Sequence, residues 1–253
     1  MKRTILSLAA VLLQFSFPAR AADIAVMSGG APKEILGALI PEFEKRTGHH
    51  VKVSYQLISA LRQKILFGEI TDLVIMPNAV IDDLVEARKL RAEGRETFGA
   101  LKLVTIARDD APKPDISTPE LFRDALVNAK SVIYATPTST PSGAHVANLL
   151  SQLQIADIIE KKVIYRPALE GGVAMVADGT AELGIYPASE VFKVKGVISI
   201  GELPEALQMN LVYGTALASA NKQNGPALAL IKYLASPKNR AVWQQMGFDP
   251  PPR

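Results

Sequence analysis

The chain has 253 residues, a formal net charge of only +3 and no cysteine. Hydrophobic residues make up 48% of it and charged residues 21%, a balance that suits a folded core and argues against disorder. This small charge excess, without clustered Lys and Arg between aromatic residues, excludes a basic nucleic-acid-binding surface. The lack of cysteine excludes thiolate zinc sites and thiol catalysis.

The first 21 residues have the pattern of an export signal. Lys2 and Arg3 give a charged start, residues 5–17 are apolar, and residues 19–21 (ARA) fit a small-residue cleavage site. A membrane anchor or a core helix is the alternative, but the apolar stretch is shorter than the roughly 20 residues that span a bilayer. We therefore expect residues 1–21 to be removed, and the mature protein to be soluble and periplasmic without a later transmembrane helix.

Three strand–turn–helix units open the mature chain. Each predicted strand is followed by a predicted helix, at residues up to 28 and 31–45, 50–55 and 60–67, and 72–76 and 79–88. Helices that follow parallel strands begin at one edge of the sheet, where open α/β folds bind ligands. A helix start offers unpaired N–H groups and the positive end of a dipole. This part of the chain therefore predicts a site for a small anion.

The middle and the end of the chain continue the alternation. A strand over 101–107 leads into a charged, proline-bearing segment, 108–114, which we take as the crossing between lobes. Thr118 is placed to cap a helix that runs to about residue 128. Later strands are predicted over 131–136, 162–166, 183–186, 197–200 and 210–216, and later helices over 144–153, 173–178, 226–234 and 237–246. The last two helices are expected to pack on the first lobe, with Trp243 in the core.

The alternation predicts an α/β protein, as one large domain or as two lobes. The stretches IAVMSGGAPKEIL, IPEFEKRTGHHVKVSY, SALRQKI, DLVIM, TPTSTPSG and AELGIYPASEV resemble the type II periplasmic solute-binding proteins, in their molybdate-binding-like group. This resemblance implies two lobes, each a mixed, mainly parallel sheet flanked by helices, joined by a two-strand hinge. Lobe one is then 22–107 plus 214–253, and lobe two is 108–213.

Ligand-binding candidates lie in or beside the turns that precede the predicted helices. They are Ser28, Gly29, Gly30, Ser59, Arg62, Thr138, Ser139, Ser142, Gly143, Gly172, Val173 and Tyr186. Hydroxyl groups donate hydrogen bonds, glycine permits close backbone approach, and arginine pairs with carboxylates in bidentate geometry. Each residue also has a structural interpretation, as a helix cap, a tight turn, a core residue or a solvated surface.

The molybdate-binding-like pattern is not kept in full. Ala31 stands where that group has a serine, Ile58 stands where a second small polar residue is common, and Pro187 has the spacing of its oxyanion-contacting tyrosine. Tyr186 is one residue early, and a one-residue shift on a strand turns a side chain to the other face. Other stretches, among them GELPEALQ, resemble a branch that includes aconitate isomerase. This resemblance implies a carboxylate ligand.

Two functions remain open. The first is a periplasmic receptor that closes its lobes on a small anion, an organic di- or tricarboxylate or an oxyanion, for an ABC-type transporter. The second is an isomerase that moves a proton in a tricarboxylate such as aconitate, with His145 and Glu170 as candidate acid–base residues. The three histidines are not clustered with carboxylates, so we expect no metal and no cofactor. We expect a monomer that binds no nucleic acid and does not insert into membranes.

Overall fold

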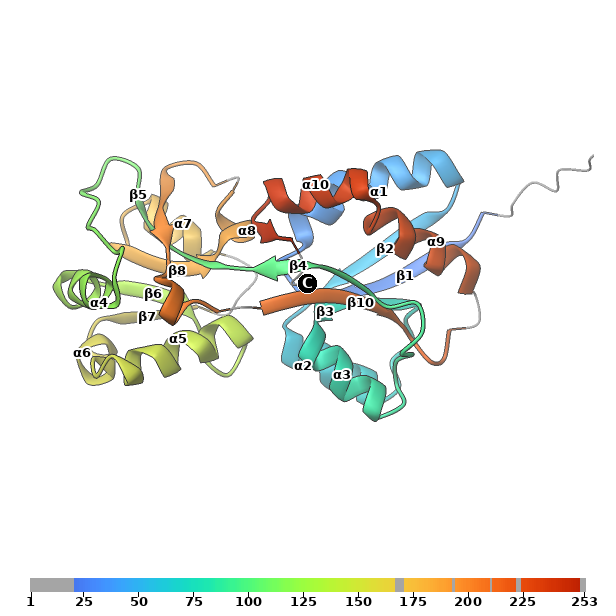
Figure 1. The fold of residues 1–253 in the computed structure, drawn as a ribbon, viewed down its shortest axis with the longest axis horizontal. Helices are drawn as coiled ribbons and strands as arrows, with labels where there is room; N and C mark the ends of the chain where they lie inside the picture. Colours follow the sequence, from blue (N-terminus) through green and yellow to red (C-terminus); the bar gives the residue numbers. More distant parts are fainter. Residues whose placement is uncertain (1–20, 167–170, 193, 210, 222–223, 251–253) are drawn as a thin grey trace, which may run out of the picture.

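The computed structural model describes residues 21–166, 171–192, 194–209, 211–221 and 224–250. They form two α/β lobes that lie side by side (Figure 1). The expected signal segment lies outside the described residues except for its last position. Among the described helices, none combines the length and the apolar character that crossing a bilayer requires.

Lobe one is built on a six-stranded sheet with helices on both faces. In spatial order its strands are β11 (Phe248–Asp249), β4 (Glu96–Leu101), β10 (Leu211–Leu217), β3 (Leu73–Pro77), β1 (Asp23–Ser28) and β2 (His50–Tyr55). One face is covered by α1 (Lys33–Thr47), α9 (Asn224–Leu234) and α10 (Pro237–Gln245). The other face is covered by α2 (Ile58–Leu66) and α3 (Asn78–Glu86). The C-terminal helices thus pack on the first lobe, as the sequence predicts.

Lobe two has the same three-layer plan. In spatial order its strands are β7 (Val163–Arg166), β6 (Val132–Ala135), β8 (Leu183–Pro187), β5 (Leu103–Arg108) and β9 (Val197–Glu202). One face carries α4 (Pro119–Asn128), α5 (Pro141–Gln152) and α6 (Ala156–Glu160). The other carries α7 (Gly172–Ala177) and α8 (Ala188–Val191). A short 3₁₀ turn, Glu205–Leu207, precedes the return to lobe one.

Both sheets are mixed, which confirms the predicted fold class. Parallel pairing joins β1 to β2 and β3, and β6 to β7 and β8. Antiparallel pairing involves β4, β5, β9, β10 and β11. The expectation of mainly parallel sheets therefore needs correction. The antiparallel pairs all include at least one strand next to a crossing between the lobes or the final strand, where the chain runs back along its neighbour.

The crossing between the lobes lies earlier than the sequence predicts. Only Lys102 separates β4 of the first sheet from β5 of the second, so the chain changes sheets there and not at 108–114. The charged, proline-bearing segment instead links β5 to α4 within lobe two. The return crossing precedes β10, before residue 211 and not at 213. The sequence analysis predicted one strand over 101–107, which covers most of β5 but only the last residue of β4, so it missed β4 and the crossing at Lys102.

Lys102 also binds both lobes through its side chain. Its ammonium Nζ lies 2.9 Å from Glu202 Oε2 on β9 and 2.9 Å from Asp249 Oδ2 on β11. These hydrogen bonds raise the pKa of Lys102 above its ordinary value, so the side chain stays charged. The two ion pairs tie the edge strands of the two sheets to the crossing point.

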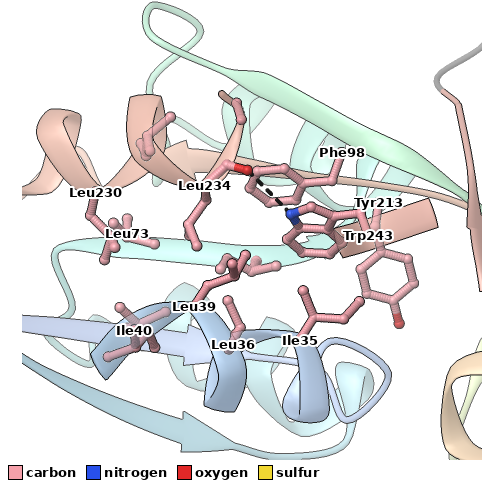
Figure 2. Packing of buried hydrophobic residues seen from close by; sticks show 14 of the residues in the cluster. Ile35, Leu36, Leu39, Ile40, Leu73, Phe98, Tyr213, Leu230, Leu234 and Trp243 are labelled. Atoms are coloured by element: carbon pink, nitrogen blue, oxygen red, sulfur yellow. Dashed lines mark hydrogen bonds between the residues drawn. The ribbon is translucent and has the colours of Figure 1, made fainter. Parts of the chain in front are cut away.

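The core of lobe one is organised around Trp243, which is fully buried (Figure 2). Its ring stacks on Phe98 at 4.2 Å between centroids and meets Phe248 edge-on at 5.1 Å. Its indole Nε1 donates a hydrogen bond of 3.2 Å to the carbonyl oxygen of Leu234. These contacts join α10 to α9, β4 and β11, which confirms the core assignment of this tryptophan.

Replacing Trp243 should test this packing. The substitution Trp243→Ala removes two ring contacts and leaves a cavity, so we expect it to lower the free energy of unfolding by about 3–5 kcal/mol. The measurement is urea denaturation followed by circular dichroism, because the chain has one tryptophan and its fluorescence is lost in the variant. Phe67, which is 89% exposed, supplies the control, and Phe67→Ala should change stability by less than about 0.5 kcal/mol. Equal losses in the two variants would contradict the assignment.

Candidate anion site between the lobes

The turn after β1 brings backbone close to two other elements. Ser28 is fully buried, and its hydroxyl donates to the carbonyl oxygen of Gly29 at 2.9 Å. A Cβ on Gly29 would lie 2.7 Å from Ile58 Cδ1 and 3.3 Å from the hydroxyl oxygen of Tyr213. Only glycine fits this contact without a shift of its neighbours, so the turn that leads into α1 is held against α2 and β10.

The helix α2 begins without a side-chain cap. The sequence analysis placed Ser59 directly before a helix from residue 60, but the helix begins at Ile58 and the preceding Leu57 makes no side-chain cap hydrogen bond. Ser59 lies in the first turn with an exposed side chain. Arg62 is also exposed and pairs with Asp83 of α3, with Nε and Oδ2 3.6 Å apart. Neither side chain lines the cavity between the lobes, although the start of their helix does.

The helix α5 begins at Pro141, three residues earlier than expected. Thr140 caps it, because its Oγ1 accepts a hydrogen bond of 3.0 Å from the backbone N–H of Gly143. The same oxygen lies 3.1 Å from Ser142 Oγ. A Cβ on Gly143 would collide with the carbonyl oxygen of Ala135, so glycine lets the first turn of α5 sit on the end of β6. Of the remaining candidates in this turn, Thr138 is exposed and Ser139 is half-buried.

The candidates around α7 gather in a different place. Val173 is buried in an apolar cluster with Tyr186 of β8. A Cβ on Gly172 would overlap the Tyr186 hydroxyl, which is buried and has no hydrogen-bond partner among the described residues. Burial raises the pKa of Tyr186 above its usual range, and the charge of Glu190 adds to this effect. These three candidates pack on the α7 face of the sheet and do not line the cavity.

A cavity of about 30 Å³ lies between the lobes where the turn before α1 meets the starts of α2 and α5. A single water needs roughly 10–15 Å³ on this measure, so the cavity has room for about two waters. Its walls combine backbone at helix starts, hydroxyl groups and apolar side chains. The lining residues are Gly30, Ala31, Gln56, Leu57, Ile58, Leu101, Thr140, Pro141, Ser142, Pro187, Glu190, Leu211 and Tyr213. We call this set the interlobe pocket.

The interlobe pocket brings together two of the predicted candidates, Gly30 and Ser142, while Gly29 and Gly143 support its walls. The sequence analysis missed two titratable residues in it. Glu190 follows β8 in α8 and is half-buried, and burial raises the pKa of its carboxyl group to about 7. Tyr213 of β10 is buried, and burial followed by the charge of Glu190 raises its pKa. The only sequence signal for Glu190 was its position in the segment ASEV, residues 188–191, which directly follows an apolar strand.

Of the two candidate acid–base residues, His145 is not among the residues that line this pocket. The ring Nε2 of His145 is 2.8 Å from the carbonyl oxygen of Leu207, to which it donates. The imidazole thereby joins α5 to the 3₁₀ turn before the return crossing. Glu170 lies outside the described residues. Within the described part of the chain, no group of three or more His, Asp or Glu side chains could hold a metal ion.

Comparison with known proteins identifies relatives along nearly the whole chain. A family model described as bacterial extracellular solute-binding protein matches residues 24–249. The chain is 30% identical over 257 residues to aconitate isomerase of Pseudomonas sp, which covers 98% of this chain and 96% of that protein. It is 25% identical to the molybdate-binding protein ModA of Azotobacter vinelandii, in an alignment that covers 98% of this chain and 97% of that protein. The solved structure of an Azotobacter vinelandii periplasmic molybdate-binding protein aligns with a TM-score of 0.76 and 17% identity, over 92% of this chain and 100% of that one. These structures share the two-lobed fold.

The close fit of Gly143 predicts a stability effect. Gly143→Ala forces the first turn of α5 away from the Ala135 carbonyl, so we expect a loss of about 1–3 kcal/mol in the free energy of unfolding. Gly37 is the matched control, because it is exposed within α1 and a Cβ there meets nothing within 4 Å. Gly37→Ala should instead raise stability by about 0.5–1 kcal/mol. Chemical denaturation of both variants measures the difference, and a shared sign would refute the packing argument.

Proposed function

This chain belongs to the bacterial extracellular solute-binding proteins, and we propose that it captures a small anionic solute between its two lobes for delivery to an ABC-type transporter. The proposal covers an oxyanion or a small organic carboxylate. Membership of this family favours a protein that binds its solute outside the cytoplasm and delivers it to a transporter. Membrane subunits of a transporter would then be the partners.

One observation carries the anion part of the proposal: the turn before α1 and the starts of α2 and α5, from both lobes, line one cavity. The first N–H groups of a helix have no partner within the helix, and its dipole places partial positive charge there. The uncapped start of α2 and the start of α1 come from lobe one, while α5 comes from lobe two. An anion between them would accept hydrogen bonds from both lobes without a cationic side chain.

Capture of this kind follows from lobe closure. A solute that contacts both lobes binds the closed arrangement more tightly than the open one, so it shifts the population toward closure. The two crossings, at Lys102 and before β10, provide a short hinge. Because the pocket measures only about 30 Å³, a solute larger than a compact oxyanion would require the lobes to stand further apart than they do here.

Ligand screening with a pocket variant tests this proposal. Thermal unfolding in the presence of molybdate, sulfate, phosphate, citrate and trans-aconitate should show saturable stabilisation by at least one anion, about 2.7 kcal/mol at a concentration 100 times its dissociation constant. Ser142→Ala removes a hydroxyl from the pocket, so it should weaken that binding by about 10-fold. The control is Ser151→Ala on the same helix, whose hydroxyl is exposed and bonds the Ala147 carbonyl at 3.2 Å. No stabilisation by any anion would refute the proposal.

A second function, isomerisation of a tricarboxylate, is favoured by one residue. Glu190 is a pocket carboxyl with a pKa of about 7, the range in which a carboxyl group both accepts and returns a proton efficiently. The Glu190 carboxylate would take a proton from the methylene carbon of trans-aconitate and leave an allylic carbanion. Return of that proton to the other end of the allylic system moves the double bond and allows the cis isomer, with no net gain or loss of protons.

Turnover separates the two functions. If the protein is an isomerase, incubation with trans-aconitate should yield cis-aconitate by proton nuclear magnetic resonance, and Glu190→Gln should lower the rate by about 100-fold or more, since it removes the general base. His145→Gln should leave most of the rate, because this imidazole bonds a backbone carbonyl outside the pocket. Binding of trans-aconitate without any cis product would exclude the isomerase.

A further inference from the structure

Glu190 occupies a position that both lobes define. It belongs to lobe two, directly after β8, yet its short helix packs against Gly247 of lobe one, where an added Cβ would lie 2.8 Å from Ala188 Cβ. Across the pocket, Tyr213 of lobe one is close enough for the Glu190 charge to raise its pKa. The carboxyl group therefore lies at the boundary that closes around a bound solute.

Among the described residues, no cationic side chain pairs with this carboxyl group. Of the pocket-lining residues, none is Lys, Arg or His, and within the described part of the chain Glu190 makes no ion pair. Two of the arginines considered for this site have other partners: Arg62 pairs with Asp83, and Arg166 Nε lies 3.0 Å from Met175 Sδ. A solute in the pocket must therefore suit both the N–H groups of the helix starts and the carboxyl oxygens of Glu190.

Hydrogen-bond chemistry decides which anions meet both conditions. An ionised carboxylate only accepts hydrogen bonds, so it repels an anion whose oxygens are also only acceptors. An anion with an O–H group can instead donate to the carboxylate while its charged oxygens accept from the helix N–H groups. A site built for such a donor discriminates strongly against the analogue that lacks it, because a buried polar group is then left unpaired.

We propose that Glu190 makes the interlobe pocket select anions that carry an O–H group, either a protonated oxyanion or a hydroxy acid, over anions that offer only acceptor oxygens. This inference rests on the proposed function of the pocket as an anion site. It assigns to Glu190 the role of a specificity-determining residue, through direct contact with the solute, and it holds whether the solute is released unchanged or is isomerised.

Acidity sets the conditions under which the selection operates. Because burial raises the pKa of Glu190 to about 7, the group is largely ionised at about pH 8.5 and largely neutral at about pH 6. The groups that face it are Tyr213 from β10 and Tyr186 from β8, and Arg166 of β7 faces Tyr186. Both tyrosines have raised pKa values and stay neutral over this range. A neutral Glu190 donates, so acceptor-only anions should bind better as the pH falls.

Two matched ligand pairs test the proposal by isothermal titration calorimetry. Phosphate and sulfate are both tetrahedral, but only phosphate keeps a proton near neutral pH, and citrate differs from tricarballylate by one hydroxyl. At about pH 8.5 the wild-type protein should bind the O–H member of at least one pair about 100-fold more tightly, and the preference should shrink at about pH 6. The phosphate pair reports a protonated oxyanion and the citrate pair reports a hydroxy acid.

Variants show whether Glu190 is responsible. Glu190→Gln carries an amide that donates at every pH, so sulfate or tricarballylate should gain at least about 10-fold in affinity at the higher pH and lose its pH dependence. The control Glu42→Gln removes the same charge from an exposed position on α1 and should behave as the wild type. Circular dichroism melting confirms that each variant is folded, and the wild-type comparison stands without any variant.

The outcomes separate this inference from the proposed function. If an anion binds but neither pair is distinguished at about pH 8.5, or if Glu190→Gln keeps the full wild-type preference, the role of Glu190 is refuted while the anion site stands. If none of the four probes, nor molybdate or trans-aconitate, binds to the wild-type protein, the proposed function itself fails. A preference that disappears in Glu190→Gln and persists in Glu42→Gln supports the inference.

Discussion

Residues at or just before helix starts line the interlobe pocket together with the carboxyl-bearing Glu190, and the proposed site depends on this combination. The helix starts of α1, α2 and α5 favour negative charge, whereas Glu190 opposes it when ionised. With no cationic side chain in the lining, neither influence is cancelled by a fixed ion pair. We therefore expect the pocket to respond to the arrangement of hydrogen-bond donors on a solute, and not only to its charge.

The chain reaches this arrangement through tight backbone contacts that glycine permits. Gly29 brings the turn before α1 against Ile58 and Tyr213, and Gly143 seats α5 on the end of β6. A Cβ at Gly143 would collide with backbone atoms of residues 135 and 136, whereas a Cβ at Gly29 would meet the end of the Ile58 side chain. The site therefore depends on packing behind the pocket wall as much as on the groups exposed in it.

Local sequence patterns predicted most elements but not the details that shape the site. The Thr118-Pro119 pair correctly marked the start of α4, and Thr118 accepts from Leu121 N–H as a cap does. The equivalent Thr140-Pro141 pair also begins a helix, but it was absorbed into a hydroxyl-rich turn. The crossing at Lys102 depends on which strands pair, and the burial of Glu190 depends on how the two lobes contact each other. Both follow from the tertiary structure, so local sequence patterns could not predict them. The type II resemblance supplied the two lobes that alternation alone left open.

The two ion pairs of Lys102 have a consequence for the surroundings in which the protein works. Its ammonium group is held by one carboxylate on each lobe, and both pairs are partly exposed to solvent. If the lobes rotate about this residue, at least one of those distances changes. Because dissolved ions screen exposed charge pairs, we expect the hinge to loosen as salinity rises, so that the molecule opens more readily in brackish water than in fresh water.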